Sequence, residues 1–470
     1  MEREIKDPHQ KALALNLDKA TYGTIAEIGA GQETARWFFR VGGAAGTIAK
    51  AMSAYSMKFS DAIYGPCQRY VSRDRLRDML DLEYRLLQER LDDSIGEQCT
   101  FFAFANTVAA RSYTYKTDGH GWLGILFQRR PKEKPSRIDI HVSLHGKQHV
   151  QDHETLGVLG VNLIYGAMRL HGDPEALLRS LMDQLYSELV EVDMIEFSGP
   201  AFGNVDNRLM ALRLVQHGLS NAAMFTADGN VAQISDTLYK KAVLLERSRF
   251  RPPTKFTLDL LDCAQQAFMD DTDVSDGEVI ELSEMTLTNL SEDGDDINVN
   301  DFLCRADILC ALGKNVLISN YGEFYRLAQF LFRYTNRPMA FTMGLPSLRE
   351  IFNEKYYEDL PGGILESFGR MFKHDLRLYV SPAIDQATGK KEGVLSLKVD
   401  EHLRHLYMYL LENNYVKALD TVKEEYLRIF SHEVLYNMQK GHHEWEKMVP
   451  EKVCQMIREQ KLFDWCGGGG

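Results

Sequence analysis

The chain has 470 residues, of which 44% are hydrophobic and 26% are charged, and its formal net charge is −13. This length and composition indicate a globular protein with two or three domains. They exclude a fibrous or wholly disordered chain, which would be poorer in apolar residues. The negative charge repels phosphate backbones, so we expect no nucleic-acid partner.

The cysteines and the amino terminus predict the compartment. Seven cysteines are scattered through the chain without CxxC spacing. An odd, sparse set of cysteines in a long chain is typical of a reducing compartment rather than of a disulfide framework. The first residues, MEREIKDPHQK, lack the apolar core of a signal peptide, and no apolar run reaches the roughly twenty residues of a membrane helix. We therefore expect a soluble cytoplasmic protein that does not bind membranes.

The first predicted strand, residues 24–29, runs through a glycine-containing loop into a helix over 33–41. Gly29 and Gly31 allow the chain to turn tightly and to bring backbone N–H groups near a ligand, and a helix amino terminus favours anions. This loop is therefore a candidate ligand-binding element.

The pattern E-x-G-x-G, which begins at Glu27, resembles the first motif of Rossmann folds that bind nucleotides or S-adenosylmethionine. Those folds also carry an acidic side chain roughly twenty residues later to hold the ribose. The sequence has no Asp or Glu between Glu33 and Asp61. A glycine turn that packs a helix against a sheet is therefore the alternative interpretation.

The next elements combine helices with an antiparallel part of a sheet. Residues 47–55 fit either a helix or a buried strand, and two strands around a basic turn indicate antiparallel pairing. Gly157 and Gly160 indicate that their helix packs closely on a neighbour. The elements predicted here are a helix over 73–91 capped by Ser72, strands over 100–108, 122–128 and 137–144, and helices over 154–168 and 174–190.

Four histidines recur every four residues: His141, His145, His149 and His153. On one continuous helix they would form a face of candidate metal ligands. The segment is instead predicted as a strand, a break at Gly146 and a helix, so the imidazoles need not converge. We predict no metal site and leave the convergence of the series open.

A polar loop follows the strand predicted over 192–197, and a helix and the strand 222–225 come next, which reads as a second strand-loop-helix-strand unit. Carboxylates and an arginine beyond a buried strand suit a metal-phosphate or a sugar. The same residue types also cap helices, and the sequence does not decide between these roles. The residues in question are Ser198, Asp206, Asn207 and Arg208.

Two prolines after Arg251 interrupt regular structure and predict a domain boundary. The predicted parts are an α/β domain over 1–251, a second α/β domain over 252–395, a helical region over 396–466 and an appended linker over 467–470. The acidic stretches 270–278 and 292–296 lack calcium-loop spacing and are predicted to be solvated.

Residues 315–349 predict a strand-helix-strand unit in the second domain, with strands over 316–319 and 339–343. Parallel strands of this kind are covered on both faces, so their polar chemistry lies in the loops beyond their carboxyl ends. The candidate residues there are Asn320, Glu323, Arg326, Gly344 and Ser347. The predicted fold class is α/β, with mixed, mostly parallel sheets, flanking helices and a helical C-terminal region that includes one helix over 415–439.

The segments AEIGAGQETARWFF, GVNLIYGA, VDMIEFSGP and NVLISNYGEFYRLAQFLFRYT resemble a bacterial protein family, and the resemblance covers most of the chain. Members carry two labels, nicotinate-nucleotide adenylyltransferase and TonB-dependent receptor. The first label implies nucleotide-handling transferase chemistry. That enzyme class binds ATP phosphates with an H-x-G-H motif, which this sequence lacks, so no catalytic residue is carried over. The receptor label does not fit a sequence without a signal peptide or repeated ten-residue amphipathic strands.

Polar or glycine-containing loops follow four of the predicted strands, those over 24–29, 192–197, 316–319 and 339–343. We expect these four loops to converge at one edge and to bind a nucleotide-like or phosphorylated small molecule. Glu27, Asp206 and Glu323 would then act as catalytic acid-base groups, and Arg208 and Arg326 would contact the anion. The other predicted ligand-binding residues are Gly29, Gly31, Ser198, Asn207, Asn320, Gly344 and Ser347. The alternative is a non-catalytic scaffold or regulator that self-associates through its C-terminal helices. The sequence specifies neither a cofactor nor whether the protein is an enzyme.

Overall fold

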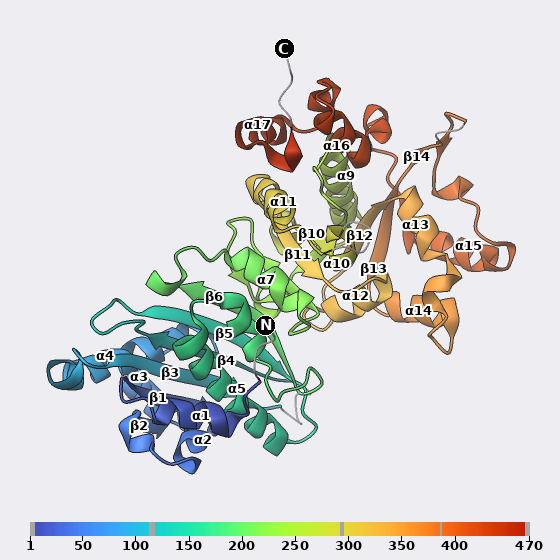
Figure 1. The fold of residues 1–470 in the computed structure, drawn as a ribbon. Coiled ribbons are helices and arrows are strands. Elements are labelled where there is room, and N and C mark those ends of the chain that lie inside the picture. The colour runs from blue at the N-terminus through green and yellow to red at the C-terminus, as the bar shows by residue number, and fades with distance from the viewer. Residues whose placement is uncertain (1–4, 112–117, 292–295, 386–387, 466–470) are drawn as a thin grey trace. The chain divides into compact units, whose positions relative to one another are not determined.

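The computed structural model describes residues 5–111, 118–291, 296–385 and 388–465 (Figure 1). The chain divides into two compact units, Met1–Ala223 and Met224–Gly470. Each unit is built around a β-sheet flanked by helices, which confirms the predicted α/β class. Most of the acidic stretch, 292–295, and the glycines at 467–470 lie outside the described residues.

The first unit contains a six-stranded sheet in the order β2-β1-β3-β4-β5-β6. β1 is parallel to β2 and β3, and the pairs from β3 to β6 are antiparallel, as the strand pair around the basic turn predicts. Of residues 47–55, Ile48–Ser53 form a strand, but it is a largely exposed edge strand rather than the buried one expected. The strands are β1 (Thr21–Gly29), β2 (Ile48–Ser53), β3 (Thr100–Ala109), β4 (Gly119–Phe127), β5 (Ser136–Leu144) and β6 (Val190–Ser198).

Side-chain alternation along β5 defines the two faces of this sheet. Ile138 and Ile140 enter the core shared with α1, α2 and α5, whereas Asp139 faces α4. The expected Ser72 cap is present, since its hydroxyl accepts the Arg75 N–H. The helices are α1 (Pro8–Asn16), α2 (Thr34–Arg40), α3 (Met57–Tyr64), α4 (Arg73–Ile95), α5 (His149–Leu170), α6 (Pro174–Ser180) and α7 (Asn207–Gln216).

The second unit contains an eight-stranded sheet in the order β16-β13-β12-β9-β10-β11-β7-β8. The pairs from β16 to β11 are parallel, and β7 pairs antiparallel with β8. The strands are β7 (Ala222–Phe225), β8 (Val231–Ala232), β9 (Ala242–Arg247), β10 (Val279–Thr286), β11 (Asn315–Ser319), β12 (Met339–Gly344), β13 (Leu376–Ser381) and β16 (Val416–Ala418); β14 (Ala383–Ile384) and β15 (Lys391–Glu392) form a separate hairpin.

The path of the chain through the parallel strands creates a topological switch point. β10 and β11 are added on one side of β9, after which the chain crosses over and adds β12, β13 and β16 on the other side. If the six parallel strands are numbered from 1 to 6 by their order in the chain, starting at β9, their order across the sheet from β16 to β11 is 6-5-4-1-2-3. This is the doubly wound order, in which ligands bind beyond the carboxyl ends of the strands where the order reverses. That point lies between β9 and β12.

Helices cover both faces of the second sheet. α9 packs on the face that contains Ala242 and Leu244, and α12 packs on the opposite face, where Phe324 contacts Phe341. α16 and α17 bury their apolar residues against Ile308 of α11. The helices are α8 (Ile234–Leu238), α9 (Lys255–Asp271), α10 (Leu287–Leu290), α11 (Val299–Ala311), α12 (Phe324–Leu331), α13 (Leu345–Ile351), α14 (Gly363–Met371), α15 (Arg404–Glu412), α16 (Ser431–Gln439) and α17 (Glu451–Gln460).

Several predicted elements differ from the structure. The single helix expected over 415–439 is wrong, because Asn414 adopts a left-handed conformation after α15 and the next residues pair with β13 as β16. The second strand-loop-helix-strand unit is also wrong, because β6 belongs to the first sheet and β7 to the second. The prolines after Arg251 lie in the turn from β9 to α9, inside the second unit.

Candidate functional site

The loop after β1 is held by Glu27, which is buried at the end of that strand. Its carboxylate accepts the N–H groups of Thr34 (2.9 Å) and Ala35 (3.4 Å) at the start of α2, and also the Asn106 amide (3.3 Å). Burial raises the pKa of Glu27 to about 6, and these hydrogen bonds limit the rise. The predicted catalytic residue therefore caps a helix and has a pKa near neutrality.

At each of the two predicted ligand-binding glycines of this loop, a different steric contact explains why the residue is glycine. Gly29 has a positive φ of 75°, and a Cβ there would lie 2.2 Å from the Val108 carbonyl oxygen. A Cβ on Gly31 would lie 2.5 Å from the Asn106 side-chain oxygen. The glycines thus let the loop pack on β3, as the glycine-turn interpretation requires.

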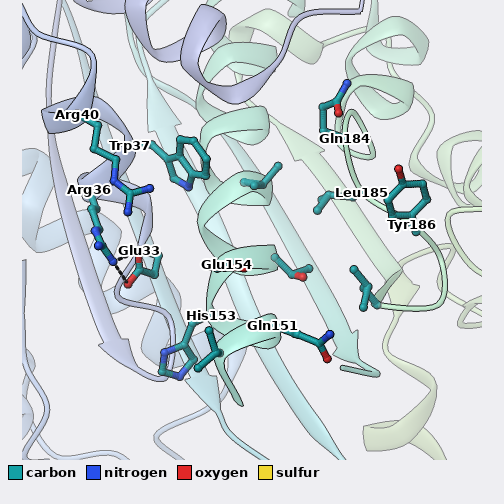
Figure 2. Close-up of a pocket in the computed structure, with 14 residues that line it drawn as sticks. Glu33, Arg36, Trp37, Arg40, Gln151, His153, Glu154, Gln184, Leu185 and Tyr186 are labelled. Carbon is teal, nitrogen blue, oxygen red and sulfur yellow. Dashed lines mark hydrogen bonds and ion pairs between the residues drawn. The ribbon is translucent and has the colours of Figure 1, made fainter. Parts of the chain in front are cut away.

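The same loop leads into a groove of about 680 Å³ over the amino-terminal half of α5. Figure 2 shows α2 residues on one side of α5 and residues 184–186 on the other. α2 approaches α5 closely because α5 carries glycines there: a Cβ on Gly160 would lie 2.2 Å from the Thr34 hydroxyl, and one on Gly157 2.7 Å from the Glu33 Cβ. The close packing predicted for these two glycines is confirmed.

Cationic and aromatic side chains line the groove. Arg36 is paired with Glu33 at 3.2 Å, whereas Arg40 has no ion pair with any described residue. The Arg40 guanidinium lies 5.4 Å from the centre of the Trp37 ring. Tyr186, which is 67% exposed, presents a second ring from the opposite wall. The groove therefore offers a positive charge without an ion pair among the described residues, beside one aromatic ring and across α5 from a second.

The predicted loop after β6 does not meet the loop after β1. β6 runs antiparallel to β1, and β3, β4 and β5 lie between them. The row of paired residues through Gly29 reaches β6 at Val192, whereas Ser198 lies at the other end of that strand. At about 4.8 Å between strands and 3.4 Å along them, the two loops are roughly 28 Å apart. The expected convergence of the loops is therefore wrong for these two.

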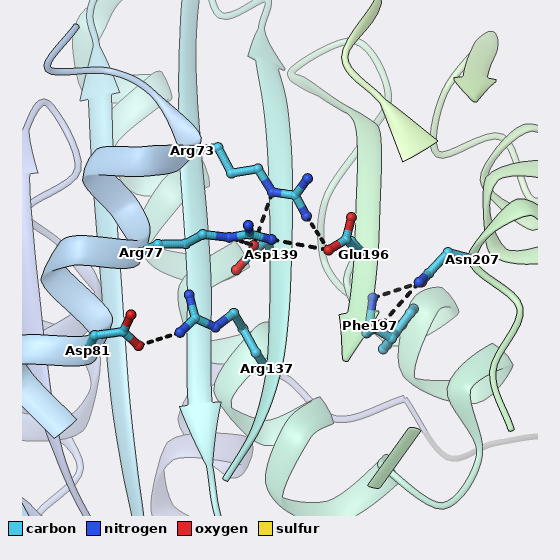
Figure 3. Close-up of polar contacts among 8 residues, drawn as sticks. All are labelled: Arg73, Arg77, Asp81, Arg137, Asp139, Glu196, Phe197 and Asn207. Carbon is cyan, nitrogen blue, oxygen red and sulfur yellow. Dashed lines mark hydrogen bonds and ion pairs between the residues drawn. The ribbon is translucent and has the colours of Figure 1, made fainter. Parts of the chain in front are cut away.

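The polar residues of the loop after β6 have structural partners. Asp206 accepts the Arg208 backbone N–H (2.8 Å) and binds its guanidinium (2.7 Å), so it caps α7. Burial alone would raise the pKa of Asp206, but Arg208 holds it below its usual range. Asn207 both donates to and accepts from the Phe197 backbone (Figure 3). These contacts match the cap interpretation.

A buried carboxylate on the opposite sheet face organises α4. Asp139 of β5 accepts Nε of Arg73 at 3.1 Å and Nε of Arg77 at 2.9 Å, and both arginines also reach Glu196 of β6 (Figure 3). We expect Asp139→Asn to lower the free energy of unfolding by about 2 kcal/mol, because two guanidinium groups lose their buried counter-charge. Urea denaturation measures this change.

The matched control is Asp81→Asn, since Asp81 pairs with Arg137 on the same face but is 59% exposed. Exposed ion pairs contribute about 0 to 1 kcal/mol, so this variant should unfold almost like the wild type. Equal losses from the two substitutions would contradict the structural role of Asp139.

In the second unit, the predicted residues lie at one edge. β11 and β12 are parallel strands of one sheet, although β9 and β10 separate them, so Asn320 and Gly344 both lie at the carboxyl edge, as expected. Asn320 is exposed, Gly344 and Ser347 are half-buried, and Ser347 lies in α13. Glu323 pairs with Arg326 at 3.3 Å at the start of α12.

The loop after β11 is fixed by a half-buried arginine. Arg247 pairs with Glu284 (2.7 Å) and donates to the carbonyls of Tyr321 (2.9 Å) and Gly322 (2.5 Å). Ser319 donates its hydroxyl proton to the same Glu284 at 2.5 Å. The charges of Arg247 and Glu284 are therefore used to hold this loop in place.

The histidine series does not form one metal site among the described residues. His141 binds Asp193 at 2.6 Å inside the first sheet, His145 lies 3.5 Å from Glu191, and His153 lines the groove. The described part of the chain contains one group whose ligand atoms are close enough to share a cation, Glu354, Asp400 and His402, and all three are exposed. His402 and Glu354 form an ion pair there at 2.7 Å.

No protein-family model and no curated protein matches the chain. Among solved structures, the chain is similar to the competence/damage inducible protein CihA from Agrobacterium tumefaciens, at 15% identity over 34% of this chain and 93% of that chain, with a TM-score of 0.24. A CinA superfamily protein from Enterobacter cloacae shares 11% identity over 36% of this chain and 95% of that chain, with a TM-score of 0.23.

A provisionally named nicotinate-nucleotide adenylyltransferase from Vibrio parahaemolyticus shares 11% identity over 47% of this chain and 95% of that chain, with a TM-score of 0.20. One label of the family that the sequence resembles thus recurs here. Scores this low support no argument about the fold or activity of this chain. None of the described helices combines the length and apolar character needed to cross a membrane.

Sequence reasoning missed most of the groove. Arg36 and Arg40 lie one helical turn apart beside Trp37, a pattern visible in the sequence. Trp37 is half-buried and lines the groove. The sequence does not show that α2 packs beside α5, and the groove exists only because these two helices lie side by side.

Proposed function

We propose that the first unit binds an anionic, nucleotide-like or phosphorylated small molecule in the groove over α5. The observation that carries this proposal is Arg40, a cation without an ion pair among the described residues, which lies beside the Trp37 ring in a groove whose opposite wall carries Tyr186. An arginine can bind a phosphate with two parallel hydrogen bonds, and aromatic surfaces accept a planar base. The volume of about 680 Å³ is ordinary for a site of this kind.

A nucleotide-handling transferase is the finer form of this proposal. Such an enzyme needs a group that exchanges a proton near neutral pH. Glu27 has a pKa of about 6, but it is buried and does not line the groove, so we assign it the positioning of α2 rather than contact with the substrate. Glu27 caps the helix that carries Arg36 and Arg40, so its protonation is linked to the wall of the groove. The scaffold alternative has less support, because α16 and α17 use their apolar residues within the second unit.

Calorimetric titration of the full chain with ADP and with inorganic pyrophosphate, each with magnesium, tests the proposal. We expect Arg40→Ala to weaken ADP binding about tenfold, the effect of losing one charge-assisted hydrogen bond. The matched control is Arg85→Ala, which removes an exposed arginine from α4 on the other sheet face. Pyrophosphate should bind more weakly than ADP because it has no ring to place against Tyr186.

Two results would overturn the proposal. One is that the wild-type protein binds neither probe. The other is that Arg40→Ala and Arg85→Ala weaken binding equally, which would indicate a diffuse charge effect rather than a site.

A further inference from the structure

Four buried polar side chains lie together on the α9 face of the second sheet. Glu246 of β9 lies directly opposite Ser283 of β10 and Thr342 of β12, so the three form one row across three adjacent strands. Ser381 of β13 lies opposite Gly344, two residues further along and on the same face. Their exposed fractions are 4%, 1%, 1% and 0%.

Each of these side chains has an atom without a hydrogen bond. Glu246 Oε2, the Oγ atoms of Ser283 and Ser381, and Thr342 Oγ1 are all buried and find no hydrogen-bond partner within the described residues. More than nine in ten buried polar groups in folded proteins are paired, and each unpaired one costs about 1 to 3 kcal/mol. Four of them in one place indicate that something outside the protein chain pairs with them.

The cluster lies where this sheet topology places ligands. β9 and β12 flank the switch point, and Glu246 and Thr342 lie within two residues of their carboxyl ends. Ser381 is the last residue of its strand, and Gly344 lies beside it without crowding it: a Cβ there would make ordinary van der Waals contacts, at 3.5 Å from Pro346 Cδ and 3.9 Å from the Ser381 hydroxyl oxygen. Gly344 is also one of the residues that the sequence predicted to bind a ligand.

The surroundings do not form the usual kind of phosphate site around this cluster. The loop from β9 to α9 contains no glycine. At the start of α9, Thr254 caps the helix, and the Lys255 N–H donates to the Met448 carbonyl at 2.9 Å. Arg247 is committed to Glu284, and Lys314 is paired with Glu281 at 2.5 Å. The cluster thus offers hydroxyls and one carboxyl group to a neutral partner.

We propose that the second unit holds a separate small-molecule site in which Glu246, Ser283, Thr342 and Ser381 bind a neutral polyhydroxyl group such as a ribose. Vicinal hydroxyls donate and accept hydrogen bonds at once, which matches a carboxyl group flanked by hydroxyls. Burial raises the pKa of Glu246 to about 8, so this side chain is neutral at pH 7 and can donate a hydrogen bond. The proposal is independent of the groove in the first unit.

Thr342→Val tests this site without disturbing the fold. The substitution keeps the side-chain shape and removes a hydroxyl that has no hydrogen-bond partner among the described residues, so the ligand-free variant should melt at the wild-type temperature or higher. The matched control is Thr335→Val in the same unit, because the Thr335 hydroxyl donates to the Lys241 carbonyl at 2.6 Å. That control should melt at a lower temperature.

Saturation-transfer NMR on the full chain measures the binding of two probes, D-ribose and adenosine, at concentrations up to their solubility limits. We expect both probes to bind the wild-type protein and Thr335→Val, and to bind Thr342→Val about three- to tenfold more weakly. Arg40→Ala should bind D-ribose normally, which separates this site from the groove.

Failure of both probes to bind saturably to the wild-type protein would overturn the proposal. So would equal binding by Thr342→Val and the wild type. A fall in melting temperature for Thr342→Val as large as that for Thr335→Val would show that its hydroxyl already has a partner, and would also overturn it.

Discussion

Replacing Lys11 with methionine should lower the free energy of unfolding of the first unit by about 3 to 5 kcal/mol, the cost of breaking a buried ion pair from one side. Lys11 lies on α1 and is fully buried. Its Nζ donates to Asp183 at 2.6 Å, to the Asn162 side chain at 2.7 Å and to the Ser180 carbonyl at 3.2 Å. Urea denaturation, combined with hydrogen exchange of α1 and α5, measures this loss.

Two further variants separate the charge effect from packing. Lys19→Met removes an exposed lysine from the segment after α1 and should change stability by less than about 0.5 kcal/mol. The double variant Lys11→Met, Asp183→Leu should lose less than the sum of its single substitutions, because no unpaired charge remains buried. A loss below about 1 kcal/mol for Lys11→Met would contradict the buried pair.

The same contacts explain why this part of the fold could not be predicted. The helix expected over 174–190 ends at Ser180, because the Asn162 amide binds the carbonyls of Leu181 and Asp183 and draws the chain into turns. Apolar periodicity does not reveal that a side chain on α5 will claim these carbonyls. Lys11 is equally ordinary in sequence, since its partner lies 172 residues away.

Local patterns predicted most strands of the first sheet but missed β10 and β16 of the second, and they did not predict how the strands are arranged. Alternation and apolar runs identified β1, β3, β5 and β6, but not the direction of β6, which depends on how many hairpins precede it. That direction separates Ser198 from Gly29. Asp206 and Asn207 instead accept hydrogen bonds from backbone N–H groups. Their residue types made this role as reasonable as ligand binding from the sequence alone.

The candidate site in the second unit shows the same limit. In the sequence, a glutamate at position 246 suggests an exposed side chain, because Glu is rarely fully buried. The structure instead places it at the centre of a parallel sheet under α9, with Ser283 and Thr342 alongside. The three residues are far apart in sequence and become neighbours only because the chain crosses over after β11 and places β12 beside β9. Only the strand order could therefore show that they lie together.

Burial of Glu246 should make the stability of the second unit fall as pH rises from about 5 to 8. Its pKa rises from 4.5 to about 8 on folding, mainly through desolvation, with Lys314 opposing and Glu281 adding to the shift. In this window the folded state holds a proton that the unfolded state has released, so stability is greatest below pH 4.5 and is lost up to pH 8. The full loss is at most about 5 kcal/mol, at 1.4 kcal/mol per pH unit.

Glu246→Gln isolates this effect, because glutamine keeps the shape but does not titrate. The difference in unfolding free energy between the wild-type protein and Glu246→Gln should shift in favour of the variant across this pH range and become constant above pH 8. The matched control, Glu412→Gln, changes an exposed glutamate of α15 and should follow the wild type at every pH. A pH-independent difference would mean that Glu246 is already ionised in the folded protein. The carboxyl group would then be an acceptor only, so a bound sugar would have to donate every hydrogen bond to it.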